Sequence, residues 1–181
     1  MTEVVSHRVT RCLSATGRGF VTHQVERLAL MLEGIPGDVH FGFTRLSGGR
    51  EPWHPRRTKI RNDRQVTLVC ATELAKIAAN LGVEQILPEW LGANLVIEGF
   101  ESLTKLAHGT RLLFASGATL YLNGENQPCR GAGAEVAAHY THRSGLDLEF
   151  VKAARGLRGQ IAAVERAGDV CPGDVIKVRK P

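Results

Sequence analysis

Cys129 stands in a segment whose residue types suit reactive thiol chemistry. The stretch NGENQPCRG, residues 123–131, follows two strand-like runs and places no apolar side chain next to the cysteine. A thiol in such a polar turn is expected to be accessible, and the neighbouring cation of Arg130 favours the thiolate, the nucleophilic and metal-binding form of cysteine. Pro128 fixes its own φ and restricts Gln127, which stiffens the turn. Cys129 is therefore the candidate catalytic residue, with an incidental loop thiol as the alternative.

The other three cysteines show little sign of chemistry. Cys12, Cys70 and Cys171 are far apart in the sequence and far from Cys129, so there is no CxxC pair and no zinc-ribbon spacing. In a reducing compartment we expect four free thiols. Cys70 ends the apolar run QVTLVC, and we interpret it, together with Cys12 and Cys171, as a small apolar side chain of the core.

The positive charge of the chain is concentrated in one segment. The net charge is +5, from 23 basic and 18 acidic side chains. Residues 54–65, HPRRTKIRNDRQ, set one acid, Asp63, against the basic side chains of Arg56, Arg57, Lys59, Arg61 and Arg64. Such a run is either a solvated loop or a site for phosphate or another anion. We do not expect a nucleic-acid partner, because Trp53 is the only aromatic side chain near the charges that could stack on bases.

His139 and His142 are three residues apart on an expected helix and near Cys129 in the sequence. Two imidazoles at this spacing can bind one metal ion. No fourth ligand is evident, however, and histidines on helix surfaces are common. We therefore do not expect these two histidines to form a metal site.

Short apolar and β-branched runs predict a mainly β fold around these residues. We expect strands within residues 3–13, 19–34, 64–71 and 94–99, a hairpin in 110–124, and a second strand pair in 159–180 with its turn at 172–174. Apolar periodicity predicts a helix over 72–82, and 134–143 and 147–156 are further helical candidates. Many short strands with a few helices favour a closed or nearly closed β-barrel with peripheral helices.

The length and composition fit one domain over residues 1–181, long enough to bury a core of its own. The first residues, MTEVVSHRVTRCLS, do not have the pattern of a signal peptide, and no apolar run approaches the ~20 residues of a membrane-spanning helix. We therefore expect a cytoplasmic protein without a membrane contact.

The order of several short motifs resembles the MOSC family, the domain found at the C-terminus of molybdenum cofactor sulfurases. The motifs follow one another along nearly the whole chain, which makes the resemblance fairly specific although each is weak alone. They are GIPGDVHFG at 34–42, RQVTLV at 64–69, LGANLVIEGFESLTKLAHGTRLLF at 91–114, QPCRG at 127–131, and GLRGQIAAVERAGDVCPGDVIKV at 156–178.

The resemblance implies a twisted β-barrel of the pyruvate-kinase-barrel type and a use for Cys129. The matching cysteine of MOSC proteins is taken to carry sulfur as a persulfide, and in the amidoxime-reducing members it binds molybdenum directly. A thiolate is both a soft metal ligand and a good sulfur nucleophile, so the residues themselves agree with either role. Molybdopterin is therefore the cofactor expected from the resemblance.

The family motifs also indicate residues that could hold such a cofactor. Asn94 matches a family asparagine, and a turn amide bonded to its own backbone is the alternative. Arg64 and Gln65 match the family's RQV, where arginine could bind the pterin phosphate or make a surface salt bridge instead. His40 could donate to an anion, whereas Asp38 beside it is interpreted as a turn residue. Arg130 completes the expected cofactor-binding set.

Two features of longer family members are missing from this sequence. It lacks the N-terminal barrel that completes the cofactor pocket of the amidoxime-reducing proteins. It also lacks the aminotransferase-like domain, and no lysine lies in a motif that would bind pyridoxal phosphate, so we expect none. The hypotheses are thus a sulfur carrier or a small reductase of N-hydroxylated compounds acting through Cys129, or a non-catalytic module that delivers the cofactor. The partner would be the cofactor, a sulfur donor or acceptor protein, or a small substrate.

Overall fold

The computed structural model describes residues 7–15, 17 and 19–181, so the start of the first expected strand, residues 3–6, lies outside the described part. The elements along the chain are β1 (His7–Ser14), β2 (His23–Val25), β3 (Leu28–Leu30), β4 (Thr44–Leu46), β5 (Lys59–Arg61), β6 (Val66–Cys70), α1 (Ala71–Leu81), the 3₁₀ helix η1 (Pro88–Leu91), β7 (Leu95–Glu98), β8 (Arg111–Leu113), β9 (Thr119–Glu125), α2 (Arg130–Ala138), α3 (Leu146–Ala153), β10 (Gln160–Arg166), β11 (Gly168–Val170) and β12 (Val175–Arg179).

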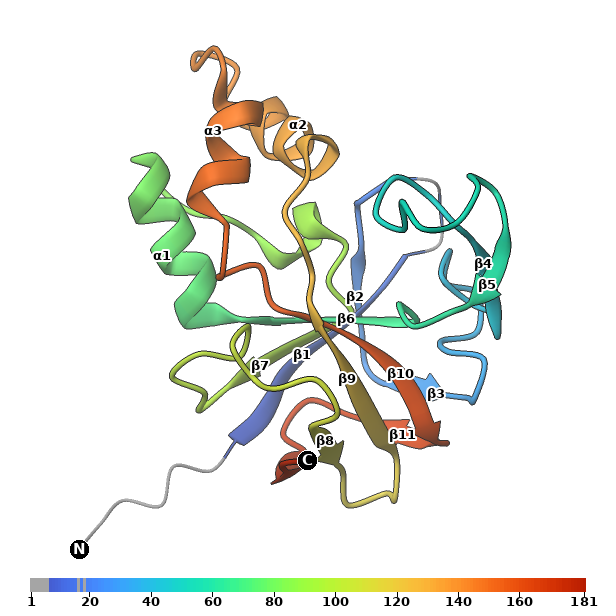
Figure 1. Ribbon diagram of the computed structural model, residues 1–181. Helices are drawn as coiled ribbons and strands as arrows, with labels where there is room; N and C mark the ends of the chain where they lie inside the picture. The colour runs from blue at the N-terminus through green and yellow to red at the C-terminus, as the bar shows by residue number, and fades with distance from the viewer. Residues whose placement is uncertain (1–6, 16, 18) are drawn as a thin grey trace, which may run out of the picture.

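The main sheet closes into a barrel, which confirms the predicted fold class. Its strands follow the order β12, β8, β9, β10, β6, β7, β1, and β12 pairs in turn with β1 to complete the ring, while β2 continues the sheet outside it (Figure 1). The pair β6–β7 is parallel and is connected through α1 and η1, whereas the neighbouring pair β9–β10 is antiparallel. Closure leaves no open edge among the ring strands, so their backbone groups are satisfied within the sheet.

Strand β6 shows why the barrel and the helices form one body. All five of its residues are buried. Because side chains alternate along a strand, Leu68 and Cys70 belong to the core inside the barrel, whereas Val69 packs into a second core with Ile77 of α1 and Phe150 of α3. The three helices lie together on one side of the barrel in Figure 1. Strand β6 is therefore covered on both faces, in agreement with the burial of all five of its residues.

The predicted helix over residues 72–82 is confirmed as α1. Leu74, Ile77 and Leu81 lie on its buried face, and Gly82 ends it in the left-handed conformation at φ 64°. The candidate at 147–156 corresponds to α3. The candidate at 134–143 begins earlier than expected, because α2 starts at Arg130 with Cys129 as its N-cap residue, and it ends at Ala138.

The run at 19–34 contains two three-residue strands, β2 and β3. One strand prediction needs correction. The expected pair within 159–180 does not form: β10 lies between β6 and β9, while β12 pairs with β8 and β1. The turn at 172–174 is present, but it connects β11, which pairs with β3, to β12 of the ring. Closing a barrel requires the last strand to reach the first, and local turn chemistry does not encode that distant pairing.

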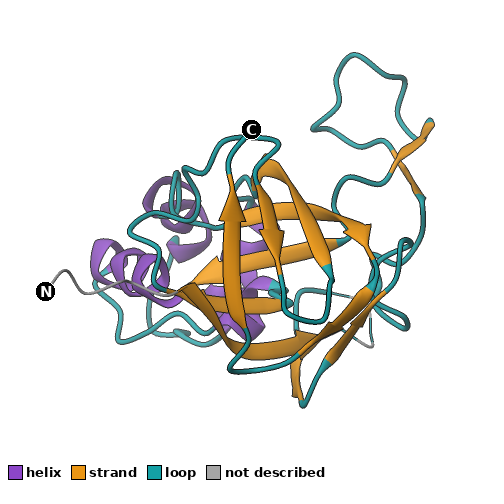
Figure 2. Ribbon diagram, turned by 90° about the horizontal axis from the view of Figure 1, so that it is seen from below, coloured by secondary structure: helices purple, strands orange, loops and turns teal. Residues whose placement is uncertain are grey.

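Strands β4 and β5 form a small hairpin with Ser47–Thr58 as its loop, and Figure 2 shows it standing away from the barrel. Arg45 holds the hairpin in shape, because its guanidinium donates to Glu51 at 2.7 Å and to Asp63 at 2.9 Å. The irregular, basic part of the sequence is thus an ordered extension beside the barrel.

The prediction that Cys12, Cys70 and Cys171 are core residues is confirmed for the first two only. None of the four thiols forms a disulfide, and Cys12 and Cys70 are buried. Cys171 is half-buried at a turn, so its interpretation as a core residue is wrong. His139 lies just beyond α2 and stacks on Trp90 with ring centroids 3.9 Å apart. Within residues 7–15, 17 and 19–181, no cluster of three or more His, Cys, Asp or Glu side chains could hold a metal ion.

A search of the same residues for a helix of sufficient length and hydropathy to cross a bilayer finds none.

Candidate functional site

Cys129 opens into a pocket of about 270 Å³ at the end of the barrel that faces the helices. The pocket is built from segments far apart in the sequence: the end of β1, the loop after β3, the β4–β5 loop, the start of β6, η1, and the connections β9–α2 and α3–β10. It is lined by Ala15, Gly19, Phe20, His40, Arg50, Arg64, Thr67, Leu91, Gly92, Asn126, Cys129 and Arg158.

The thiol is positioned by the start of α2. Cys129 keeps an extended backbone at φ −136° and ψ 161°, and its carbonyl accepts the first helical hydrogen bond, from Gly133. A Cβ atom added at Gly131 would lie 3.9 Å from Cys129 Sγ and 3.0 Å from the ring of Phe20. The sulfur therefore lies beside the first turn of α2, where unpaired backbone N–H groups and the helix dipole favour a negative charge.

Arg158 is the feature that the sequence reading missed. Its residue is only 2% exposed, and its Nη2 donates to the carbonyl of Leu91 at 3.0 Å. Its Nε and Nη1 are buried without a hydrogen-bond partner, which is true of no other arginine or lysine in the described ranges. Burial lowers the pKa of this guanidinium to about 10, and the charge of Cys129 acts in the opposite direction. A buried cation with two free donors is costly unless an anion pairs with it.

Arg64 and Arg50 add two more guanidinium groups to the pocket. Arg64 is held by Asn126, whose Oδ1 accepts from its Nη2 at 3.0 Å. Burial, together with the nearby charge of Arg50, lowers the pKa of Arg64 to about 10. Arg50 reaches over from the β4–β5 loop, and its Nη2 donates to the carbonyl of Gln127 at 2.9 Å. The three cations thus surround the Cys129 turn, and no carboxylate is among the residues that line the pocket.

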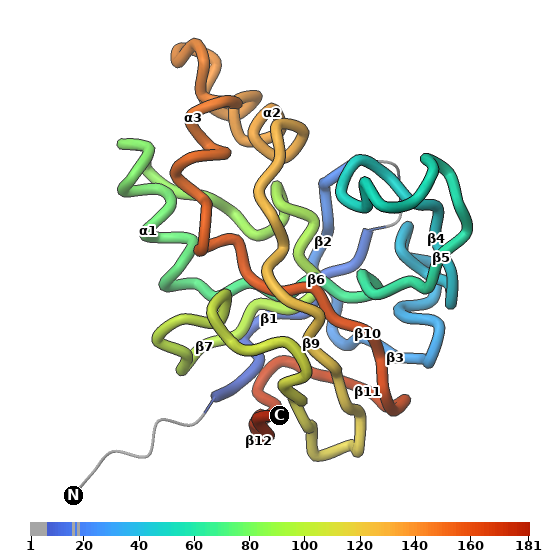
Figure 3. The backbone as a smooth tube through the Cα atoms, viewed as in Figure 1, coloured from blue at the N-terminus to red at the C-terminus, as the bar shows by residue number. Residues whose placement is uncertain are grey.

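The connections that carry Cys129 and Arg158 run next to each other. Gln160 of β10 pairs with Glu125 of β9, and the amide of Asn126 donates to the carbonyl of Gly159. Figure 3 shows the chain leaving β9 for α2 beside the chain that returns from α3 to β10. Gly159 is required at this contact, because a Cβ atom there would lie 1.9 Å from the carbonyl oxygen of Leu68.

Asn94 does not line the pocket, but it is hydrogen-bonded to a residue that does. It is 1% exposed; its Oδ1 accepts from the amide of Thr67 at 2.9 Å, and its Nδ2 donates to Asp38 at 3.0 Å. Asp38 in turn accepts from the amide of His40 at 2.9 Å and lies 3.0 Å from its Nδ1. Burial opposes ionisation of Asp38, but the hydrogen bonds from His40 and Ala15 outweigh it and lower the pKa of the carboxyl. This chain of contacts orients His40 at the pocket wall.

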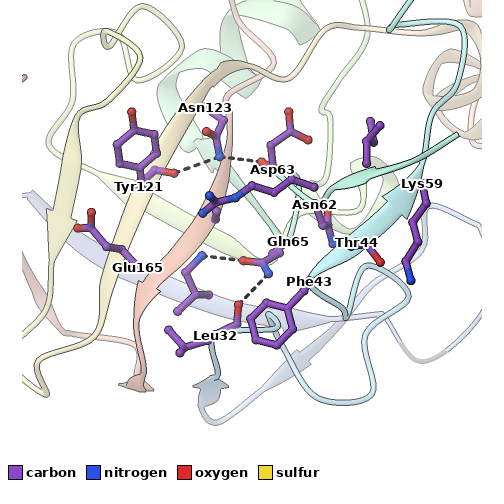
Figure 4. Close-up of a pocket in the computed structure, with 14 residues that line it drawn as sticks. Leu32, Phe43, Thr44, Lys59, Asn62, Asp63, Gln65, Tyr121, Asn123 and Glu165 are labelled. Atoms are coloured by element: carbon purple, nitrogen blue, oxygen red, sulfur yellow. Dashed lines mark hydrogen bonds between the residues drawn. The ribbon is translucent and has the colours of Figure 1, made fainter. Parts of the chain in front are cut away.

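Gln65 and Arg130 lie outside the Cys129 pocket. Gln65 faces a larger cavity of about 1010 Å³ between the β4–β5 hairpin and the barrel, which Leu32, Phe43 and Tyr121 also line (Figure 4). Arg130 is an exposed side chain that donates to Asp147 at 2.8 Å. The structure thus gathers Cys129, Arg64 and His40 at one pocket, supports it through Asn94, and separates Gln65 and Arg130 from it.

The sequence indicates the three further pocket residues, Arg158, Arg50 and Asn126, to different degrees. Arg158 lies between the two glycines of GLRG, and nothing in this motif distinguishes the arginine from a surface residue. Asn126 lies three residues before Cys129, within the polar segment of residues 123–131. Arg50 has no sequence signal of its own, because only the fold of the hairpin brings it to Gln127.

Comparisons with known proteins agree with this architecture. The family model of the MOSC domain matches residues 37–177, a range that includes Cys129 and all three arginines of the pocket. The chain is 45% identical over 164 residues to YuaD of Bacillus subtilis, a candidate metal-sulfur cluster biosynthesis protein by its name, with 91% of this chain and 85% of YuaD covered.

Two solved structures share the fold of this chain, one at high and one at low sequence identity. The crystal structure of Bacillus subtilis YuaD superposes with a TM-score of 0.95 at 42% identity, covering 97% of each chain. YiiM from Geobacillus stearothermophilus has a TM-score of 0.65 at 13% identity, covering 96% of this chain and 75% of YiiM, and therefore shares the fold alone.

Proposed function

Because this chain belongs to the MOSC domain family, we propose that it handles the molybdenum cofactor, or sulfur destined for a metal centre, through Cys129. The observation that supports this proposal is the placement of the thiol of Cys129 in one pocket with Arg64 and the buried, partly unpaired guanidinium of Arg158. The name of YuaD, which refers to metal-sulfur cluster biosynthesis, is consistent with such a role.

The chemistry of the pocket suits a soft, anionic ligand. Thiolate sulfur binds molybdenum and also accepts a second sulfur atom to form a persulfide. Each of these states carries negative charge, and arginine guanidinium groups bind oxyanions through two parallel hydrogen bonds. The helix start at Arg130–Ala138 adds partial positive charge beside the sulfur.

The donor chemistry of the pocket fits the metal and one anionic group of the molybdenum cofactor and not the whole molecule, because the pocket volume is about 270 Å³. Cys129 offers a soft ligand, and the free Nε and Nη1 of Arg158 offer donors for an anionic group. When bound, the cofactor would supply a redox-active metal for reduction of a substrate such as an N-hydroxylated compound. The chain itself would hold the anionic end with Arg158 and Arg64, keep His40 oriented through Asp38, and limit water with Phe20.

The decisive experiment is expression in a host that makes the molybdenum cofactor, followed by metal analysis and mass spectrometry for sulfane sulfur. We expect the wild-type protein to hold molybdenum or one extra sulfur. Cys129→Ser should lose both, because a hydroxyl is a hard, poorly ionised ligand that carries no sulfane sulfur. Cys171→Ser is the matched control, since Cys171 is also half-buried but does not line the pocket.

Wild-type protein that contains neither ligand, or a Cys129→Ser variant that retains one, would contradict the proposal. Turnover of an N-hydroxylated test compound by molybdenum-loaded protein would distinguish a small reductase from a module that only delivers the cofactor.

A further inference from the structure

We infer that the Cys129 pocket accepts a small sulfur oxyanion of the thiosulfonate class, of which thiosulfate is the simplest, as a sulfur donor to Cys129. The inference rests on the proposed sulfur role of Cys129 and adds the chemical class of the donor. It is carried by the buried Arg158, which lines the same pocket as the thiol and whose Nε and Nη1 have no hydrogen-bond partner.

The donor geometry calls for an oxyanion. The Nη2 atom of Arg158 is already used by the carbonyl of Leu91, which fixes the plane of the guanidinium. The two remaining nitrogens, Nε and Nη1, are buried and without partners. Nε and Nη1 lie on opposite sides of the guanidinium, so they donate singly and not as a parallel pair, and a sulfonate oxygen can accept such a single charge-assisted hydrogen bond.

The size and the charge of the pocket favour a small dianion. Its volume of about 270 Å³ lies below the range of about 300–1,000 Å³ usual for sites of whole drug-sized ligands. Arg50, Arg64 and Arg158 bring three positive charges; no carboxylate is among the lining residues, and Asp63 and Glu51 outside the lining offset part of the charge of Arg64. A dianion with few atoms satisfies this arrangement better than a large neutral ligand.

The thiol determines which oxyanion can react. The Cys129 thiolate attacks the outer, sulfane sulfur of thiosulfate, a new S–S bond forms at Cys129, and the S–S bond within thiosulfate breaks. Sulfite leaves with the electron pair of that bond, so one thiolate and one thiosulfate give one persulfide and one sulfite with no change in total charge. Sulfite leaves without being protonated, so the step needs no carboxylic acid in the pocket. Arg158 and Arg64 would hold the sulfonate oxygens throughout.

The experiment is to incubate reduced protein with thiosulfate and to measure both the sulfur added at Cys129, by peptide mass spectrometry, and the sulfite released. We expect one sulfite for each persulfide formed. Arg158→Lys, which keeps the charge but loses the guanidinium donors, should lower the loading rate about tenfold or more. Arg27→Gln is the matched control, because Arg27 pairs with Asp169 at an exposed site and does not line the pocket.

A second variant covers the case in which Arg158→Lys does not fold. Arg50 is exposed and donates to the loop carbonyl of Gln127, so Arg50→Gln should fold normally. We expect sulfate to protect Cys129 from alkylation in the wild-type protein, and Arg50→Gln to weaken this protection several-fold. Protection that Arg50→Gln leaves unchanged would overturn the inference.

An inorganic polysulfide separates this inference from the function on which it rests. If polysulfide loads Cys129 but thiosulfate does not, the oxyanion donor is wrong and the sulfur role of Cys129 stands. If neither reagent loads Cys129, the sulfur role itself fails. Loading from thiosulfate at the same rate in wild type and in folded Arg158→Lys would also overturn the inference.

Discussion

Two cavities of this protein differ in volume and also in whether the charged groups that line them are paired. In the larger one, of about 1010 Å³, the carboxylates of Asp63 and Glu165 pair with Arg45 and Arg111. In the smaller one, of about 270 Å³, Arg158 keeps two buried nitrogens without partners. An unpaired buried charge is costly and is tolerated where a ligand completes it. The pairing of charge, rather than volume, therefore indicates which cavity is prepared for an anionic ligand.

The largest expected difference concerns the thiols inside and outside the smaller cavity. Burial raises the pKa of Cys12 to about 12, so only about 1 part in 10⁴ of this thiol is ionised at pH 8. Cys129, beside three arginines and a helix start, should therefore react first with an alkylating reagent. Limited alkylation of the native protein followed by peptide mapping tests this order. Earlier labelling of Cys12, Cys70 or Cys171 would place the reactive site elsewhere.

Replacing the buried amide side chain beside each cavity should lower the stability of the fold in both cases, but should change the reactivity of Cys129 in only one. Asn94 bonds Thr67 and Asp38 below the smaller cavity, whereas Gln65 bonds Leu32 and Val164 at the larger one. Asn94→Ala and Gln65→Ala should each destabilise the fold by about 2–4 kcal/mol, because buried groups lose their partners. Only Asn94→Ala should also change the alkylation rate of Cys129. Urea denaturation and alkylation kinetics measure both effects.

Equal changes of the Cys129 rate in these two variants would mean that the cavities are coupled. Asn94→Ser is a useful companion variant, since a hydroxyl can retain part of the bonding in a smaller side chain and should give an intermediate loss of stability.

A smaller effect should appear in the pH dependence of stability. The pKa of Asp38 is lowered in the folded protein, so its carboxylate contributes stability above the ordinary value of about 3.9, and this contribution is lost as the pH falls through the folded value. Wild-type protein should therefore lose stability more steeply than Asp38→Asn on acidification below about pH 5. Urea midpoints measured over this range test the slope. Parallel curves would show that the His40 and Ala15 contacts do not hold the carboxylate.

The smallest effect is expected from the exposed arginines of the hairpin region. Arg56, Arg57 and Arg61 do not line the Cys129 pocket, whereas Arg50 does. Replacing all three with Gln should therefore leave the binding of cofactor or sulfate unchanged, and Arg50→Gln should weaken it. Binding measured at two salt concentrations checks this contrast, because exposed charges act less at high ionic strength. A large loss of affinity in the triple variant would extend the anion site onto the hairpin.

Local patterns predicted the elements whose signals are local. The apolar period of residues 72–82 and the glycine at its end are sufficient for α1, and the arms of the β8–β9 hairpin meet across Ser116–Gly117 as expected. The same reasoning failed at residues 159–180, where turn residues were present but β10 and β12 paired with other strands. It also started α2 too late, because Cys129 is an unusual N-cap residue and has no capping side-chain bond.

The candidate site divides in a similar way. Cys129, Arg64 and His40 were identified from residue type and resemblance, and the structure brings them to one pocket. Gln65 and Arg64 are adjacent in the sequence, yet they face different cavities. Side chains point to opposite faces along an extended segment, and a motif match does not say which face meets the ligand.

The sequence by itself determined that this is a mainly β chain and that one cysteine follows a proline in a polar segment, because residue periodicity and residue type are local properties. Only the tertiary structure decided that Arg158, on a connection near the other end of the chain, lies buried in the pocket of that cysteine with two donors unpaired. Its position follows from the antiparallel pairing of β9 with β10, and the close contact at Gly159 maintains it. The electrostatic character of the site is therefore a consequence of strand pairing in the barrel, which joins segments distant in the sequence and cannot be read from any single stretch of residues.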